Sequence, residues 1–123
     1  MKSQAVLVLG TYANKDLVDI LLSIGLAPLV RENIQGVLDK VRHEQFGAIV
    51  VDQRHANIDV LELILNVRDV DGRIPVVVLG KLRDEAIRKT LASQKQIKVV
   101  GDTKDGQKLA GRLGEIFASL EGK

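Results

Sequence analysis

Five short apolar runs alternate with five amphipathic segments along the chain. The runs lie at residues 5–10, 27–31, 46–52, 76–80 and 97–102. Such runs predict strands, and those at 46–52 and 76–80 are apolar enough for strands that are buried on both faces of a sheet. The run at 27–31 is short and ends in a charged residue, which favours a position at the edge of the sheet.

Between these runs, apolar residues recur at helical spacing, most clearly in the first and last helices. The predicted stripes are Leu17, Ile20, Leu21 and Ile24 in the first helix, and Leu109, Leu113, Ile116, Phe117 and Leu120 in the last. Asn14 is the expected N-cap of the first helix, and Gly25 is its expected C-terminal stop.

The three middle helices have less regular stripes. Their expected apolar positions are Val37, Leu38 and Val41 in the second helix, Leu61, Ile64 and Leu65 in the third, and Ile87, Thr90 and Leu91 in the fourth. The third helix is predicted at 60–67, because the turn DVDGRIP follows it, and the fourth at 83–93. Gly36 weakens the start of the second helix.

Strands that alternate with helices, through connections too long for hairpins, predict right-handed crossovers and a parallel sheet. The expected fold is an α/β, three-layer α/β/α sandwich with a five-stranded parallel sheet and five helices. A length of 123 residues fits a single domain spanning residues 1–123.

Composition excludes several kinds of function. The chain has no cysteine, which excludes disulfide frameworks and thiolate metal sites and fits a reducing, cytoplasmic location. No apolar run approaches the roughly 20 residues needed to cross a bilayer. The N-terminal segment MKSQAVLVLG runs directly into a predicted strand, so no signal peptide is expected. The net charge is +2 with scattered lysines and arginines, so neither a membrane nor a nucleic acid is an expected partner.

Common catalytic and ligand-binding motifs are missing as well. His43 and His55 have no accompanying cysteine or HExxH spacing, so we expect surface histidines and no metal site. The first loop, LGTYANKD, lacks the glycines of a P-loop or a dinucleotide fingerprint. A flavin or small-ligand site would use Ser, Thr and Gly with aromatic walls, whereas this loop offers only Thr11 and Tyr12. An enzyme is therefore not expected. A small-ligand or flavin binder is kept as the third hypothesis, after the two that are given at the end of this section.

Asp52 is the residue best placed for chemistry, because it would end the third strand at the edge where open α/β sheets hold their sites. In the stretch FGAIVVDQRHANIDVLELILNVRD, followed by IPVVVLG, the chain resembles the receiver domain of bacterial two-component response regulators. The match runs without a gap. It places Asp52 on the phosphoacceptor, Asp59 on a later aspartate of the same loop, and residues 61–63 on the start of the following helix.

The resemblance implies the CheY-like, flavodoxin-like fold, with strands in the order 2-1-3-4-5. It also implies an aspartyl phosphorylation that needs Mg²⁺. In receivers the signal leaves through the face formed by helix four, strand five and helix five, which also mediates dimers. A protein partner or a homodimer is therefore expected on that face.

Other positions of the pocket depart from the receiver pattern. Receivers end the first strand with two acidic residues that hold Mg²⁺, where this chain has Gly10 and Thr11. They end the fourth strand with Ser or Thr, where this chain has Gly80, and the fifth with Lys, where it has Gly101 or Asp102. Mg²⁺ prefers several hard oxygen ligands, so its binding is expected to be weak or absent and Asp52 to be vestigial as a phosphoacceptor.

Lys81 suggests what replaces the metal. The hypothesis is that the ammonium group of Lys81, or with lower expectation the guanidinium group of Arg54, reaches into the pocket and pairs with Asp52. The alternative is that Lys81 points to solvent and Asp52 caps its own loop.

The function expected from these observations is a stand-alone pseudo-receiver, which binds a protein partner without metal-dependent phosphorylation. The second hypothesis is a phosphorylatable single-domain response regulator that uses Asp52 in a phosphorelay.

Overall fold

The computed structural model describes residues 4–10, 15–54, 58–82, 84–94, 96–101 and 105–121, in which five strands and five helices alternate. The strands are β1 (Ala5–Leu9), β2 (Ala27–Arg31), β3 (Ala48–Asp52), β4 (Val76–Leu79) and β5 (Ile97–Val100). The helices are α1 (Lys15–Ser23), α2 (Ile34–His43), α3 (Val60–Val70), α4 (Glu85–Ala92) and α5 (Gly106–Glu121).

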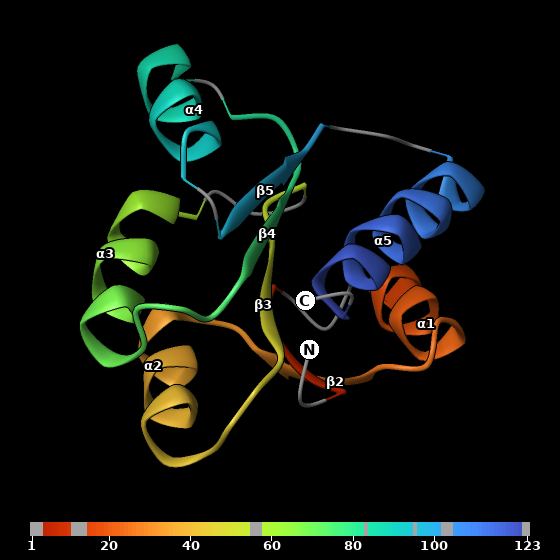
Figure 1. Ribbon diagram of the computed structural model, residues 1–123, viewed down its shortest axis with the longest axis horizontal. Helices are drawn as coiled ribbons and strands as arrows, with labels where there is room; N and C mark the ends of the chain where they lie inside the picture. Colours follow the sequence, from red (N-terminus) through yellow and green to blue (C-terminus); the bar gives the residue numbers. More distant parts are fainter. Residues whose placement is uncertain are drawn as a thin grey trace.

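All five strands are parallel and lie in the order β2-β1-β3-β4-β5 (Figure 1). Both the parallel sheet and its strand order are as the sequence and the receiver resemblance predict. The central strand β3 is buried along its whole length, as is β4 beside it. The order reverses direction between β1 and β3, so their carboxyl ends border the place where such sheets hold their sites.

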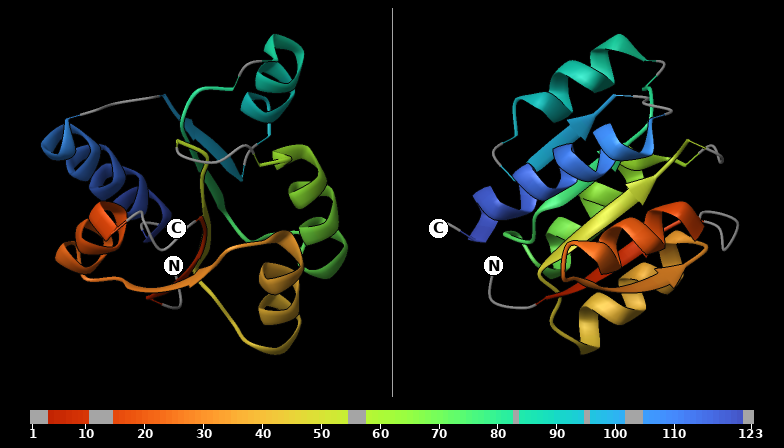
Figure 2. Two further views of the ribbon diagram at one scale, coloured as in Figure 1. Left: turned by 180° about the vertical axis from the view of Figure 1, so that it is seen from behind. Right: turned by 90° about the vertical axis from the view of Figure 1, so that its right-hand side faces the viewer.

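The helices form a layer on each side of the sheet. Helices α2, α3 and α4 cover one face, and α1 and α5 cover the other (Figures 1 and 2). Successive residues of a strand point to opposite faces, so β1 places Leu7 and Leu9 in the first core and Val6 and Val8 in the second. Strands with both faces buried must be apolar throughout, which explains their composition.

Most of the predicted helical stripes face these cores, but the stripe of α3 was predicted wrongly. Leu65, expected to be buried, is 61% exposed, and Leu61 is only partly buried. The buried residues are Val60, Leu63, Ile64 and Val67. Since nearly every residue from 60 to 67 is apolar, periodicity alone does not choose the buried face.

A glycine closes the end of α1, and a polar side chain caps the start of α2. Gly25, at a φ of +88°, ends α1: its N–H donates to Leu22 O, and the next N–H, of Leu26, donates to Leu21 O. Asn33 caps α2 by accepting from the N–H of Gly36 at 2.7 Å, which offsets the weak propensity of that glycine. The expected cap of α1, Asn14, lies outside the described residues.

Helices α3 and α4 differ in length from their predictions. Helix α3 continues to Val70, beyond the predicted end at residue 67. Helix α4 begins at Glu85 after the N-cap Asp84, so it is shorter than the predicted 83–93. In α4 Leu91 is buried and Ile87 is partly buried, while Thr90 is exposed and bonds back to Ala86 O. Helix α4 therefore has little apolar contact with the sheet.

Strand β2 forms one edge of the sheet, as predicted. The N–H of Ala27 and the carbonyl of Arg31 bond toward the β1 side, so the alternate residues Pro28 and Val30 face the open edge. Pro28 has no N–H to offer there. The carbonyl of Val30 accepts from Nη1 of Arg31 at 2.8 Å. Two of the outward positions on this edge are thus already blocked.

Candidate functional site

Asp52 is the last residue of β3 and is 0% exposed. It is the only buried charged side chain among the residues that the structure describes. Its register partner is Leu79, the last residue of β4. The carboxylate therefore lies at the carboxyl edge of the sheet, where the sequence predicts it.

The chain folds back over this carboxylate immediately after β3. Gln53 N donates to Leu79 O at 3.0 Å, and Arg54 N donates to Asp52 Oδ1 at 3.1 Å. An aspartate that accepts the N–H two residues later forms a common side-chain turn. This turn starts the Arg54 side chain beside the Asp52 carboxylate.

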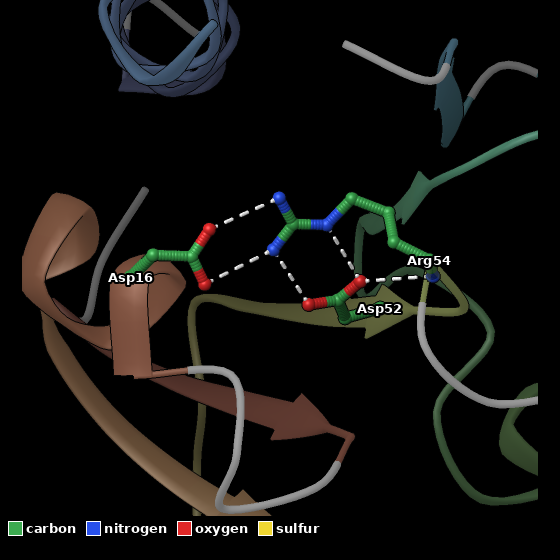
Figure 3. A network of polar contacts seen from close by, with 3 residues as sticks. All are labelled: Asp16, Asp52 and Arg54. Atoms are coloured by element: carbon green, nitrogen blue, oxygen red, sulfur yellow. Dashed lines mark hydrogen bonds and ion pairs between the residues drawn. The ribbon is translucent and has the colours of Figure 1, made fainter. Parts of the chain in front are cut away.

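The guanidinium group of Arg54 then pairs with both oxygens of Asp52 (Figure 3). Nε donates to Oδ1 at 2.9 Å and Nη2 donates to Oδ2 at 2.9 Å. The Arg54 side chain is 9% exposed, so the pair is largely removed from water. A two-point contact of this kind is the strongest geometry for a guanidinium and a carboxylate.

A second carboxylate holds the outer side of the same guanidinium. Asp16, in the first turn of α1, accepts from Nη1 of Arg54 at 3.2 Å and from Nη2 at 3.5 Å (Figure 3). Its side chain is 57% exposed. Sequence reasoning missed Asp16, because 38 residues separate it from Arg54 and only the sheet topology brings the two together.

The electrostatics of this trio keep Arg54 charged. The hydrogen bond to Asp52 raises the pKa of Arg54 well above its usual value, burial opposes this, and the charges of Asp52 and Asp16 raise it further. A raised pKa in a base means that the group keeps its positive charge at every pH below that pKa. The guanidinium is therefore a permanent cation in this site.

Gly80, directly after β4, leaves room for this arrangement. Its φ is +107°, and a Cβ atom there would lie 3.2 Å from the backbone N of Arg54 and 3.2 Å from Cγ of Gln53. A side chain would be strained in this conformation and would press on the turn that carries Arg54. Glycine at position 80 thus lets the turn that carries Arg54 pack closely against the end of β4.

Lys81 was the preferred partner of Asp52 in the sequence analysis, and the structure corrects this. Its side chain is exposed, and its backbone carbonyl accepts from Nε2 of Gln53 at 3.3 Å. Arg54, the second choice, forms the pair instead. The turn at Asp52 brings Arg54 close, whereas Lys81 follows a glycine in a left-handed conformation.

The other predicted pocket positions contribute no charged group that the structure describes. Gly10 is buried and extends β1 by donating its N–H to Arg31 O at 3.0 Å. Gly101 is exposed after β5, with open space where a Cβ would be. Thr11 and Asp102 lie outside the described residues.

Two further residues singled out from the sequence lie away from this site, on helices α2 and α3. Asp59 caps α3 by accepting from the N–H of Glu62 at 3.0 Å. His43 is an exposed residue of α2, with its side chain 71% accessible, as predicted for a surface histidine. His55 lies outside the described residues.

The donor set around Asp52 does not fit a divalent cation. In the described part of the chain, no group of three or more His, Asp or Glu side chains could hold a metal. Both oxygens of Asp52 already accept from Arg54, whose positive charge would repel a second cation. The described residues that meet at Asp52 therefore hold a guanidinium group and do not offer a set of oxygen ligands to a divalent ion.

Comparisons with known proteins find matches to the fold of this chain but none to its sequence. No protein-family model and no curated protein matches the sequence. Solved structures do match: a response regulator receiver domain protein (CheY-like) from Methanospirillum hungatei superposes with a TM-score of 0.75 at 14% identity, covering 98% of both chains. This chain has the receiver fold.

Two other structures with the receiver fold extend the comparison. Full-length FixJ from B. japonicum matches with a TM-score of 0.75 at 18% identity over 98% of this chain, which spans 60% of FixJ. The receiver domain of a sensor histidine kinase from Pseudomonas aeruginosa, solved with magnesium coordinated in its active-site cleft, matches with a TM-score of 0.69 at 16% identity. That match covers 92% of this chain and 95% of that domain.

No helix in the described part of this receiver fold is long and apolar enough to cross a membrane.

Proposed function

We propose that residues 1–123 form one receiver-like domain that acts as a pseudo-receiver in two-component-type signalling. It binds a protein partner or a second copy of itself, and Asp52 is not phosphorylated by the metal-dependent route. One observation carries the proposal: the buried carboxylate of Asp52 is held at both oxygens by Arg54.

The ion pair opposes phosphorylation because the attacking oxygen must first be freed. Removing one partner from a buried ion pair costs about 3–5 kcal/mol. Each ~1.4 kcal/mol added to a barrier slows a reaction about tenfold. If Arg54 must leave before Asp52 reacts, transfer slows by roughly two to four orders of magnitude.

Weak or absent Mg²⁺ binding adds to this barrier. Phosphoryl transfer depends on positioning and on neutralising the charge of the moving group. Two like charges near 4 Å repel by about 4 kcal/mol at an effective dielectric of 20, so a divalent ion beside Arg54 is strongly disfavoured. The described residues Gly10, Gly80 and Gly101 supply neither the carboxylates nor the lysine that receivers use.

The proposed contact surface is the face formed by α4, β5 and α5. Helix α4 buries only Leu91, so most of its surface is available to a partner. Lys98 in β5 is exposed, and the alternation of side chains along the strand places it on the face of the sheet that α5 covers, opposite α4. The domain would act through this protein contact, with no catalytic activity and no nucleic acid or membrane as partner.

The phosphorylation test uses acetyl phosphate or beryllofluoride with Mg²⁺ and the wild-type chain. We expect no added mass after acetyl phosphate and no change in amide chemical shifts around β3 after beryllofluoride. Asp52→Asn is the control for reaction at this site. Modification of the wild type that disappears in Asp52→Asn would overturn the proposal.

The contact surface is tested separately by cross-linking the wild type at increasing concentration, with candidate partners added. Lys98→Glu should reduce the cross-linked product severalfold. Arg42→Glu, which reverses an exposed charge on α2, is the matched control and should leave it unchanged. Equal loss in both variants would argue against the α4–β5–α5 face.

The alternative is a phosphorylatable response regulator that uses Asp52 in a phosphorelay. The position of Arg54 at both oxygens of Asp52 favours it. Guanidinium groups bind phosphate oxygens as well as carboxylates, so Arg54 could neutralise a transferred phosphoryl group. This alternative predicts modification of the wild type that persists when Mg²⁺ is chelated and is lost in Arg54→Gln.

A further inference from the structure

The Arg54 guanidinium lies between two carboxylates that come from different elements. Asp52 ends β3, and Asp16 belongs to the first turn of α1 (Figure 3). A single nitrogen, Nη2, donates to Asp52 at 2.9 Å and to Asp16 at 3.5 Å. We infer that Arg54 is a built-in cation that fills this site and excludes divalent metal ions from it, with Asp16 as its positioning residue.

The contacts support a cation site and not only a surface ion pair. Exposed ion pairs usually have one partner and little effect, whereas Arg54 has two carboxylate partners and is 9% exposed. Four of the nitrogen–oxygen contacts between these side chains are 3.5 Å or shorter. The guanidinium group is thus held between the carboxylate oxygens of Asp52 and Asp16, which are the kind of ligands that would bind a cation.

Asp16 contributes from the solvent side. Asp52 binds the Nε and Nη2 edge of the guanidinium, and Asp16 accepts from Nη1 at 3.2 Å and over a longer contact of 3.5 Å from Nη2. Because Asp16 is carried by α1, it attaches that helix to the turn after β3. Asp16 therefore restricts the guanidinium to the orientation in which it covers the Asp52 carboxylate.

The inference extends the proposed function, on which it rests, by naming the residue that sets the ion preference of the pocket. If Arg54 is what excludes metal, then removing its charge should admit one. Between unit charges, like-charge repulsion near 4 Å changes a binding constant about fivefold in water and about 1000-fold at an effective dielectric of 20, and the repulsion energy doubles for a divalent ion. Arg54→Gln should therefore bind a divalent ion at least about tenfold more tightly than the wild type.

The experiment titrates Mn²⁺ into the full chain and follows paramagnetic broadening of backbone amide signals. In Arg54→Gln we expect saturable broadening of the amides near residue 52. The wild type should show none at the same Mn²⁺ concentration. Arg54→Lys, which keeps a positive charge at this position, is the matched control and should behave like the wild type.

The role of Asp16 is tested in the Arg54→Gln background. Adding Asp16→Asn should weaken Mn²⁺ binding about tenfold or more, and adding Asp52→Asn should abolish it. Broadening of the wild type at the same Mn²⁺ concentration as Arg54→Gln would overturn the inference. A folded Arg54→Gln that shows no broadening would do the same.

A second measurement keeps the inference testable if Arg54→Gln does not fold. In the wild type, the side-chain Nε–H of Arg54 should exchange slowly with solvent and should not shift on adding Mg²⁺. Asp16→Asn should speed exchange at the Nη groups severalfold while Nε–H stays protected by Asp52. Rapid exchange of Nε–H in the wild type would overturn the inference.

The two proposals fail in different ways. Phosphorylation of the wild type at Asp52 overturns the proposed function. A wild type that resists phosphorylation, together with a folded Arg54→Gln that does not bind Mn²⁺, leaves the proposed function intact and overturns the built-in cation alone.

Discussion

Arg54 changes what a buried aspartate does at the end of a parallel strand. The hydrogen bond to Asp52 raises the pKa of the guanidinium above its usual value, so the pair does not open by loss of a proton at any pH in which the chain stays folded. Raising the pH is therefore not a route to a free Asp52 carboxylate. Only replacement of Arg54, or competition for its partners, would expose it.

Gly80 gives the most direct prediction for a single residue. Gly80→Ser restores the residue type that receivers have here, yet it should lower the free energy of unfolding by about 1–3 kcal/mol. The φ of +107° is strained for any residue with a Cβ, and that Cβ would lie 3.2 Å from the backbone N of Arg54. Thermal unfolding should show a loss of roughly 2–8 °C per kcal/mol.

The control for this prediction is Gly101→Ser. Gly101 also follows a strand, but its φ is not in the left-handed region and a Cβ there meets nothing within 4 Å. Its substitution should change the midpoint by much less than that of Gly80. Equal effects of the two variants would show that the close approach to Arg54 has no energetic weight.

The sequence predicts the position of Asp52 well, since strand patterning alone puts it at the carboxyl edge of the sheet. It also contains the Asp-x-Arg spacing that lets Arg54 fold back, but Lys81 competes with Arg54 in any ranking by charge. The turn in which Arg54 N donates to Asp52 Oδ1 determines that Arg54 is the partner of Asp52, and this turn depends on the local backbone geometry. Asp16 has no comparable local signal, because its contact with Arg54 depends on the arrangement of β1, α1 and β3.

Among the helices, α4 buries the fewest described side chains. It is eight residues long and buries one side chain, Leu91. Isolated helices of this length are marginal in water, so its stability depends on its cap and on its few tertiary contacts. Asp84 accepts from the N–H groups of Ala86 at 2.9 Å and Ile87 at 3.2 Å.

Asp84→Ala should therefore loosen α4 locally. Loss of an N-cap costs about 1 kcal/mol, which corresponds to roughly fivefold faster hydrogen exchange when exchange follows local opening. We expect this increase at the amides of α4 and no change at those of β3. Asp84→Asn keeps the cap and should exchange like the wild type, whereas an equal increase in β3 would indicate global destabilisation instead.

The element scale also shows why periodicity failed for α3. The predicted stripe of Leu61, Ile64 and Leu65 and the observed one of Val60, Leu63, Ile64 and Val67 share only Ile64. Both are acceptable helical spacings in a segment with so many apolar residues. The central strands did not require such a choice. Both of their faces are buried, so a run of apolar residues predicts the strand without any need to decide which residues face the core.

At the scale of the whole molecule, the protection of the β2 edge of the sheet against pairing with another chain can be tested. Pro28→Val adds an outward N–H at the second residue of β2, and Arg31→Met removes the donor that covers the carbonyl of Val30. An edge strand with free backbone groups pairs readily with other strands. We expect the double variant to show more oligomer than the wild type in sedimentation velocity at matched concentration.

Each single variant should lie between the wild type and the double variant. The bonds between β2 and β1 use the alternate residues, so thermal stability should change little. A double variant as monodisperse as the wild type would show that Pro28 and Arg31 do not protect this edge.

The blocked edge of β2 also limits how two copies of the chain could meet. A dimer built by joining sheets at this edge would run β2 of one copy against β2 of the other, forming one continuous ten-stranded sheet. Pro28 and the Arg31 side chain obstruct that arrangement from both subunits at once, since twofold symmetry presents the same obstacle twice. A homodimer is therefore disfavoured at the β2 edge, which leaves the other edge of the sheet, β5, and the helices beside it as the surface on which two copies could meet.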